Sequence, residues 1–360
     1  MTVFLALLLC IVFLDLKTAG KDRFYSDFMS RERTSAVNGL FTLLVFFSHA
    51  GSYLPMDAPV DAPYTAFRGF LGQLVVVPFL FYSGYGILES IRQKGLPYVK
   101  AIPFRRFFRV FYHMAVAVCL YILVNLILGN EMTVSNTLLA FTGWTSIGNS
   151  NWYVFAILSL YAIAFVSFLA ARGNLYLGAA FTTALTLLCV FWQMRLGRDS
   201  WTYDTMLMFP AGMVFSLAHP YFQKLLGKND TIYMLFFAGL LAVFLLANER
   251  RGSNLGWYTL WCGFFMLLVL ALTMKFSLNN SILQWLGSHV FSIYILQRIP
   301  FQLLCRLGYR ERPYLCIVLS FCFTAVLAVL FDAAVSRLDR LLYSRRKEKG
   351  KKLPEKGPNP

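Results

Sequence analysis

Long apolar runs, separated by short polar connections, recur along most of the 360-residue chain. A run of about 20 apolar residues is long enough to cross the hydrocarbon core of a bilayer as a helix. Backbone polar groups have no water to bond with there, so continuous apolar runs of this length form helices. The sequence therefore predicts an all-α, polytopic integral membrane bundle. About eleven spans are expected, at residues 3–16, 37–54, 70–90, 110–129, 152–171, 175–193, 205–222, 231–248, 255–274, 281–304 and 314–335.

Composition excludes an ordinary soluble domain, because 58% of the residues are hydrophobic and only 14% are charged. A net charge of +16 is also typical of nucleic-acid-binding proteins. Here the basic residues occupy short connections and one tail, so the expected partner is the lipid bilayer and no nucleic acid is expected. The seven cysteines fall singly, without a CxxC pair, which predicts neither a disulfide framework nor a metal site.

The first apolar run, 3–16, has no positively charged segment before it and no small-residue cleavage site after it. It is therefore interpreted as a retained extra N-terminal transmembrane helix within residues 1–20, and not as a signal peptide. The distribution of Lys and Arg among the connections predicts an N-terminus outside and a C-terminus in the cytoplasm. Residues 336–360 are rich in Lys, Arg and, near the end, Pro, which predicts a basic, disordered cytoplasmic tail lying along an anionic leaflet.

One apolar run carries a histidine about two-thirds of the way across it. Asn38 and His49 are about three helical turns apart on one face, roughly 16 Å along the axis, with Thr42 and Ser52 near the same face. A polar face of this kind is costly against lipid and is expected to look into protein or a wet cavity. His49 is either a buried histidine satisfied by a neighbour or a general base that takes a proton from a hydroxyl.

A second polar stretch lies at the predicted inner end of the third span, where residues 79–87 read FLFYSGYGI. Its glycines allow the helix to bend or another backbone to approach closely. The arginines that follow, Arg105, Arg106 and Arg109, lie at the predicted cytoplasmic surface. They are typical of a positive-inside anchor, and they also suit a clamp for the phosphates of a nucleotide-bearing donor.

Two further polar stretches interrupt the apolar pattern. The turn 143–153 contains Asn149 and Asn151, which can cap the next helix or orient a sugar hydroxyl. In the stretch 287–298, His289 and its polar neighbours are explained by hydrogen bonding between helices, and the remaining histidines, His113 and His219, are interpreted as structural. The sequence contains no HExxH, Walker, GxSxG or paired-carboxylate motif.

Taken in order, these stretches resemble the membrane-bound acyltransferase-3 family, which includes the O-acetyltransferases of bacterial surface polysaccharides. The resemblance covers about residues 33–335, and the first span is an addition in front of the family's usual ten. The matching stretches are 35–49 with the opening motif of a basic residue, ten others and a histidine; 81–85 with FFxSGY; 105–110 with RRxxRI; 152–161 with WF…Y; and 287–296 with LGxxSYxIYLxH.

The resemblance implies a multi-pass protein of the bacterial inner membrane that moves an acyl group, most often acetyl, from cytoplasmic acyl-CoA to a hydroxyl of a cell-surface polysaccharide or lipid-linked sugar. Acyl-CoA is then a donor substrate, and no permanently bound cofactor is expected. The distance of roughly 16 Å between Asn38 and His49 is comparable to an extended pantetheine arm. The implied site residues are His49, Asn38 and Arg33 for catalysis; Arg105, Arg106, Arg109, Ser83 and Tyr85 for acyl-CoA; and Asn149, Asn151, Trp152 and Tyr153 for the acceptor.

Three positions depart from the family pattern. Asn38 stands where the opening motif has a basic residue, so either Arg33 supplies that charge or the role is absent. Ile157 replaces a common carboxylate, and Gln297 replaces the histidine that ends the last motif. These departures leave a catalytically silent scaffold of polysaccharide assembly open as an alternative. A glycan or acyl-group transporter is the other alternative, although the sequence shows no inverted repeat. The acceptor hydroxyl, the acyl chain and the oligomeric state are not specified by the sequence.

Overall fold

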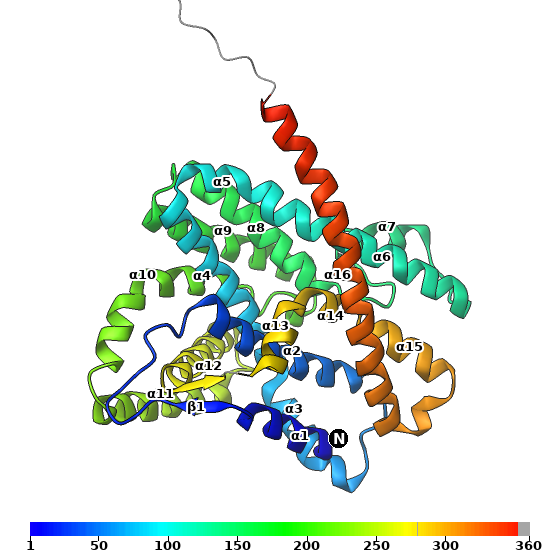
Figure 1. Ribbon diagram of the computed structural model, residues 1–360, viewed down its shortest axis with the longest axis horizontal. Helices are drawn as coiled ribbons and strands as arrows, with labels where there is room; N and C mark the ends of the chain where they lie inside the picture. Colours follow the sequence, from blue (N-terminus) through cyan, green and yellow to red (C-terminus); the bar gives the residue numbers. More distant parts are fainter. Residues whose placement is uncertain (279, 352–360) are drawn as a thin grey trace, which may run out of the picture.

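The structure is a computed structural model that describes residues 1–278 and 280–351, with side chains described through Leu342. It is a bundle of α-helices joined by short turns, with one small two-stranded sheet (Figure 1). The elements are α1 (Thr2–Phe13), β1 (Leu16–Thr18), α2 (Arg31–Ala50), α3 (Ala62–Leu71), α4 (Val77–Lys94), α5 (Leu96–Ile102), α6 (Arg109–Leu128), α7 (Val134–Ala140), α8 (Trp152–Ala170), α9 (Leu175–Arg195), α10 (Met208–Leu226), α11 (Asp230–Arg250), α12 (Leu255–Lys275), β2 (Phe276–Leu278), α13 (Ser281–Ser288), α14 (Val290–Leu296), α15 (Arg298–Arg306) and α16 (Pro313–Lys351), with short 3₁₀ or π turns between some of them.

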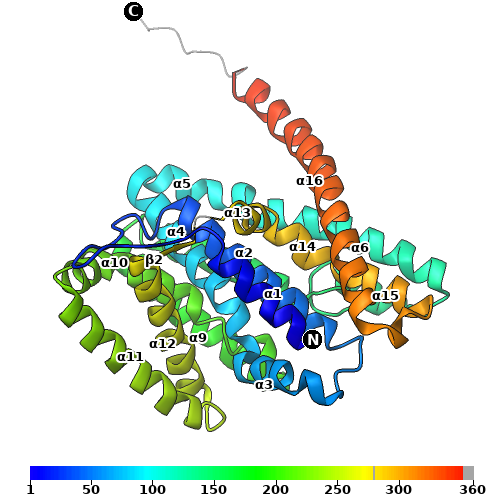
Figure 2. The same ribbon diagram turned by 60° about the horizontal axis from the view of Figure 1, so that its bottom comes forward.

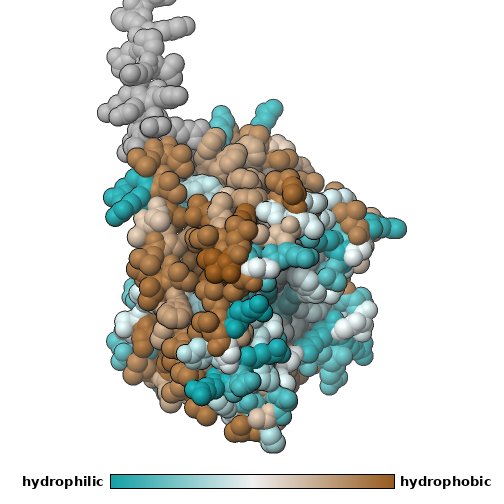
Figure 3. Space-filling view, turned by 90° about the vertical axis from the view of Figure 1, so that its right-hand side faces the viewer, coloured by the Kyte–Doolittle hydropathy of each residue, from teal (hydrophilic) through white to brown (hydrophobic). Residues whose placement is uncertain are grey.

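Seven helical segments among the described residues are long and apolar enough to cross a membrane, and each overlaps a predicted span. Large apolar side chains are exposed along several of these helices, as expected for surfaces that face lipid. Figure 3 shows apolar side chains covering much of one face, with hydrophilic ones gathered beside them. The seven segments are Pro59–Lys94, Leu96–Leu128, Trp152–Ala170, Leu175–Arg195, Asp230–Arg250, Leu255–Lys275 and Pro313–Leu342.

The other four predicted spans differ from simple apolar helices. α1 has 12 residues, which is about 18 Å of helix and shorter than a bilayer core of about 30 Å. α2 and α10 have 20 and 19 residues but carry more polar side chains. The predicted span 281–304 is divided into α13, α14 and α15.

The break between α13 and α14 has a local cause. The hydroxyl of Ser288 and the ring of His289 both lie within hydrogen-bond distance of the Trp285 carbonyl, at 2.7 and 2.9 Å. The His289 amide bonds instead to the carbonyl of Leu286, three residues before it. Side chains that bond to a nearby carbonyl compete with the helical pattern and end the helix. The apolar run alone did not reveal this interruption.

The predicted disordered tail also differs from the structure. α16 continues through residue 336, where the tail was expected to begin, and ends at Lys351. Residues 336–351 contain no proline and are rich in Leu, Arg, Lys and other good helix formers, which explains why the helix continues. Residues 352–360 of the predicted tail lie outside the described residues. Figures 1 and 2 show α16 extending well past the other helices.

The small sheet ties the start of the chain to the end of α12. β1 and β2 are antiparallel, with Leu16 opposite Leu278 and Thr18 opposite Phe276. The amide of Ala19 donates to the carbonyl of Lys275 at 2.9 Å, which extends the same connection. The segment between α1 and α2 is therefore fixed against the end of the bundle where α12 stops (Figure 2).

Glycines allow two pairs of helices to cross in backbone contact. A Cβ at Gly84 of α4 would overlap the carbonyl of Phe209, and one at Gly212 of α10 would overlap the carbonyl of Phe81. The same relation joins Gly39 of α2 to the backbone of α13. Lipid tails are as apolar as the helix surfaces, so hydrophobic burial does not drive helices together in a membrane. Small residues at a crossing let the two backbones approach closely, and the resulting van der Waals contacts stabilise the pair. The two crossings place α2, α4, α10 and α13 around the candidate site.

Replacing Gly84 by alanine is expected to destabilise the protein. The added methyl group collides with backbone and not with a flexible side chain, and overpacking of this kind costs about 1–3 kcal/mol or more. Gly239→Ala in α11 is the control, because no atom lies within 4 Å of a Cβ built there. Thermal unfolding in detergent should show a lower midpoint for Gly84→Ala and an unchanged or higher midpoint for Gly239→Ala. Equal midpoints would contradict the role of this crossing.

Candidate active site

Two cavities meet at the end of the bundle that carries the arginine cluster. The larger one, the vestibule, encloses about 1590 Å³. The smaller one, the chamber, encloses about 340 Å³ and lies deeper among the helices. The two share part of their lining, so they lie next to each other. The shared residues are Phe79, Ser83, Arg105, Arg106, Arg109, Tyr153 and Val290.

The vestibule is strongly basic. Its described lining contains six Lys or Arg side chains and one carboxylate, that of Asp339. A concave surface lined by one sign of charge concentrates ligands of the opposite sign. The vestibule therefore favours an anion. The basic residues are Arg31, Lys94, Lys100, Arg105, Arg106 and Arg109.

Arg105 and Arg106 lie on a π-helical turn, Pro103–Phe108, and Arg109 is the first residue of α6, which follows directly. All three arginines line both cavities. Nε of Arg106 donates to the Tyr98 hydroxyl at 3.1 Å, and Arg109 forms an ion pair with Asp339 at 2.9 Å. Turns of this kind occur often at functional sites because they rotate side chains out of the regular helical pattern. Here the turn brings consecutive arginines to the same space.

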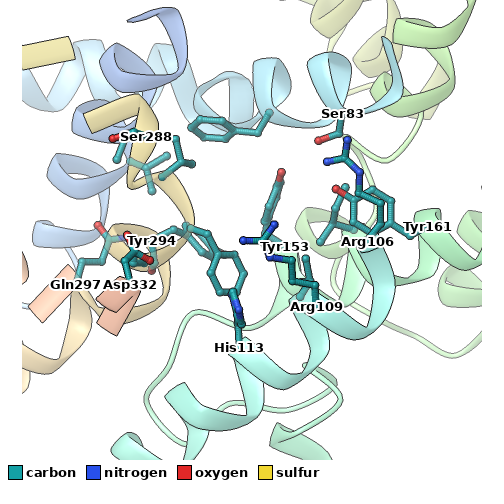
Figure 4. Close-up of a pocket in the computed structure, with 18 of the residues that line it drawn as sticks. Ser83, Arg106, Arg109, His113, Tyr153, Tyr161, Ser288, Tyr294, Gln297 and Asp332 are labelled. Carbon is teal, nitrogen blue, oxygen red and sulfur yellow. The ribbon is translucent and has the colours of Figure 1, made fainter. Parts of the chain in front are cut away.

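Ser83 and Tyr85 reach the cavities from α4. Ser83 lines both of them, and Tyr85 lines the vestibule. The Tyr85 hydroxyl lies 3.2 Å from Nδ1 of His219 on α10, just beyond the close crossing at Gly84. The glycine-rich stretch therefore serves helix packing and at the same time places Ser83 beside Arg106 (Figure 4) and Tyr85 in the wall of the vestibule.

The chamber is lined by residues from six helices, α2, α6, α8, α13, α14 and α16, in addition to α4 and the π-helical turn. Figure 4 shows Ser83, Arg106 and Tyr161 together on one side and Gln297 and Asp332 on the other. The chamber combines aromatic rings with several hydrogen-bonding groups, which is typical of a site for a polar organic ligand. Its remaining described lining comprises Thr42 and Val45 of α2; Arg105; Arg109, Val110 and His113 of α6; Tyr153 and Ile157 of α8; Phe79; Ser288, Val290, Phe291, Ser292 and Tyr294.

His49 lies just beyond the chamber. It is one turn after Val45 on the same face of α2, and its ring centre is 6.1 Å from that of Tyr294, which lines the chamber. Tyr294 therefore lies against both the chamber and the histidine. Nδ1 of His49 is buried and has no hydrogen-bond partner among the described residues. This nitrogen is therefore available to a ligand or a water molecule, as a general base requires.

Residues 36–333, well over half of the chain, match the family model for an acyltransferase domain. The chain belongs to the acyltransferase-3 family. Comparison with curated proteins and with solved structures gave no match. Family membership supports acyltransferase activity in general and agrees with the helical membrane bundle described above.

The two polar positions expected to assist His49 lie apart from it. Asn38, about 16 Å away along α2, lines the vestibule, and its buried Oδ1 has no hydrogen-bond partner in the part of the chain that the structure describes. Arg33 lines neither cavity. It forms an ion pair with Asp27 at 2.9 Å, and its guanidinium lies 4.0 Å from the centre of the Tyr25 ring. Asn38, which occupies the position of the family's basic residue, therefore lines the vestibule. Arg33, the alternative source of that charge, does not.

Of the four residues expected to bind the acceptor, Tyr153 lines both the vestibule and the chamber, and the other three line neither. Oδ1 of Asn149 accepts from the amide of Ile147 at 3.0 Å, and Nδ2 of Asn151 donates to Gly143 at 3.0 Å. Asn151 occupies the position before α8, but its side chain does not cap that helix. Trp152 contacts another tryptophan, Trp201. In this structure both asparagine side chains form hydrogen bonds within their own loop, residues 143–151, and stabilise it.

Two carboxylates on α16 were not singled out from the sequence. Asp332 lines the chamber, accepts from Ser292 at 2.8 Å and lies 3.7 Å from Nε2 of His289. Asp339 lines the vestibule and contacts both Arg109 and His113. Asp332 lies within the apolar run 314–335, and an ionisable residue inside a span is itself a signal of function. That signal was available in the sequence. The contacts of Asp339 were not, because it follows the apolar run in a basic segment.

Proposed function

We propose that the chain is a membrane-bound O-acyltransferase that moves an acyl group, most commonly acetyl, from acyl-CoA to a hydroxyl of a cell-surface polysaccharide or lipid-linked sugar. The observation that supports this most strongly is the adjacency of a basic vestibule and a chamber that has Tyr294 in its wall, with His49 behind that ring. An anion site with a buried base at the far end of the adjoining chamber suits a donor that has phosphates at one end and a thioester at the other.

The donor would lie along this space. Arg105, Arg106 and Arg109 would bind the phosphates of CoA, since guanidinium groups pair with phosphate oxygens in a bidentate manner. The pantetheine arm would follow the face of α2 from Asn38 past Thr42, both of which line the space. Roughly 16 Å separates Asn38 from His49, a length comparable to that arm.

The reaction would then proceed by direct transfer. His49 takes the proton of the acceptor hydroxyl as the oxygen attacks the thioester carbonyl, which forms the new C–O bond. The tetrahedral intermediate collapses, the C–S bond breaks, and the thiolate of CoA leaves with both electrons of that bond. The proton held by His49 passes to the thiolate, which leaves an ester and free CoA and returns the histidine to its neutral form.

The acceptor would enter at the His49 side. Tyr153 and Tyr294 offer aromatic faces, and Gln297 offers a buried side-chain oxygen that no described residue hydrogen-bonds. Aromatic surfaces beside hydrogen-bonding groups suit a sugar ring. In the bacterial inner membrane, with the N-terminus outside, this side would face away from the cytoplasm, and the vestibule would face cytoplasmic acyl-CoA.

The O-acetyl content of surface glycan tests this proposal. Proton NMR of glycan from wild-type and deletion cells, before and after mild alkali, should show ester signals in the wild type that are absent from the deletion. Purified protein in nanodiscs should transfer label from radioactive acetyl-CoA to that glycan. If the ester signals are equal in the two strains and the purified protein transfers no label, the proposed reaction is wrong.

A further inference from the structure

We propose that Asp339 is a positioning residue that holds Arg109 in place for the phosphates of the acyl-CoA donor. This inference rests on the proposed function, because it assigns a role within the donor site. No motif in the sequence pointed to Asp339. The structure brings it to the arginine cluster from α16, which is more than 200 residues away along the chain.

The contacts of Asp339 form a chain of three side chains. Oδ2 of Asp339 lies 2.9 Å from Nη2 of Arg109, and Oδ1 lies 3.4 Å from Nε2 of His113. Asp339 and His113 are 15% and 12% exposed, whereas Arg109 is 54% exposed. The carboxylate is therefore fixed between two residues of α6, while the guanidinium that it holds remains open to the vestibule and the chamber.

The ion pair leaves Arg109 able to bind a phosphate. A guanidinium has five N–H donors in a rigid fork, and the contact with Asp339 uses one edge of it. A free arginine side chain must give up conformational freedom when it binds a ligand, whereas a held side chain has already done so. Asp339 should therefore increase affinity for the donor through preorganisation.

Competition between Asp339 and the donor would have the opposite effect, and the charges of the vestibule argue against it. Asp339 is the single carboxylate in the described lining, against six basic side chains. The space therefore stays strongly positive with the ion pair in place. The second oxygen of Asp339 faces His113 and not the cavity arginines, so the carboxylate is held away from the position that a phosphate would take.

The test compares two donors on the full-length protein in nanodiscs. Acyl-CoA carries the phosphates, whereas the matching acyl-pantetheine has the same thioester without the nucleotide. Asp339→Asn is expected to raise KM for acyl-CoA about tenfold, the size of one lost charge-assisted contact, with kcat unchanged. With acyl-pantetheine, Asp339→Asn should match the wild type, because that donor does not use Arg109. Asp339→Glu should recover much of the acyl-CoA affinity.

Two further variants separate positioning from general structural damage. Combining Asp339→Asn with Arg109→Ala should give no larger KM than Arg109→Ala alone, because Asp339 acts through that arginine. Asp230→Asn removes another ion pair, with Lys275 at 2.5 Å, whose residues line neither cavity. It should leave the kinetics with both donors unchanged.

Several results would overturn the inference. Wild-type or lower KM for acyl-CoA in Asp339→Asn would show that the carboxylate is neutral or competes with the donor. An equal loss with acyl-pantetheine would show a structural role, and Asp339→Glu covers the case in which the asparagine variant does not fold. Wild-type protein that neither binds nor uses acyl-CoA would overturn the donor site itself, and this result is distinguishable because it precedes any comparison of variants.

Discussion

Replacing His49 by alanine or glutamine should abolish acyl transfer while the protein remains folded in the membrane. Loss of a general base costs about 10²- to 10⁴-fold in rate. The effect on folding should be small, because Nδ1 of His49 has no hydrogen-bond partner among the described residues. Glutamine has a similar length and keeps a polar group, so His49→Gln separates the loss of the base from the loss of volume. Initial rates with labelled acetyl-CoA, together with size-exclusion chromatography, measure both effects.

His219→Gln is the matched control for this prediction. His219 is also a helical histidine, but it lines neither cavity, and glutamine retains a polar group beside the hydroxyl of Tyr85. Its activity should stay within a few-fold of the wild type. Full activity in both His49 variants would refute the base assignment. The ionisable groups that line the chamber itself, Asp332 and His113, would then be the next candidates.

The double variant Arg105→Ala with Arg109→Ala should impair use of acyl-CoA far more than use of the acceptor. Hydrogen bonds to charged groups contribute about 1.5–3 kcal/mol each, and this value must be reduced here because Arg109 is 54% exposed. KM for acyl-CoA is therefore expected to rise about ten- to hundredfold, with a smaller effect at high salt. Steady-state kinetics with each substrate varied in turn provide the measurement.

Arg310→Ala with Arg312→Ala is the control for charge alone. These two arginines lie between α15 and α16 and line neither cavity, so the variant removes the same net charge without touching the vestibule. It should leave KM for acyl-CoA unchanged. If the Arg105 and Arg109 variant raises KM for donor and acceptor equally, the arginines are structural and the donor site lies elsewhere.

Glycine and histidine positions show how far the local sequence can predict this site. The close approach of another backbone was one of two expectations for the glycines in 79–87, and Gly84 contacts α10 in that way, while a Cβ at Gly86 would meet nothing within 4 Å. His49 was expected on one face with Asn38 and Thr42, and those two residues line the vestibule and the chamber, respectively. That His49 lies behind Tyr294 was not predictable, because the position of Tyr294 depends on how α14 packs beside α2.

The sequence by itself determined the helical membrane bundle, the positions of most spans, the family and the arginine cluster. These properties depend on residues close together in the chain, where apolar length, glycine spacing and clustered charge have local physical effects. Only the tertiary structure decided which side chains share the cavities, that Asn149 and Asn151 stabilise their own loop, and that Asp332 and Asp339 join the site. His113 and Asp339 are 226 positions apart. Contacts over such separations arise from the packing of whole helices, and no local pattern encodes them.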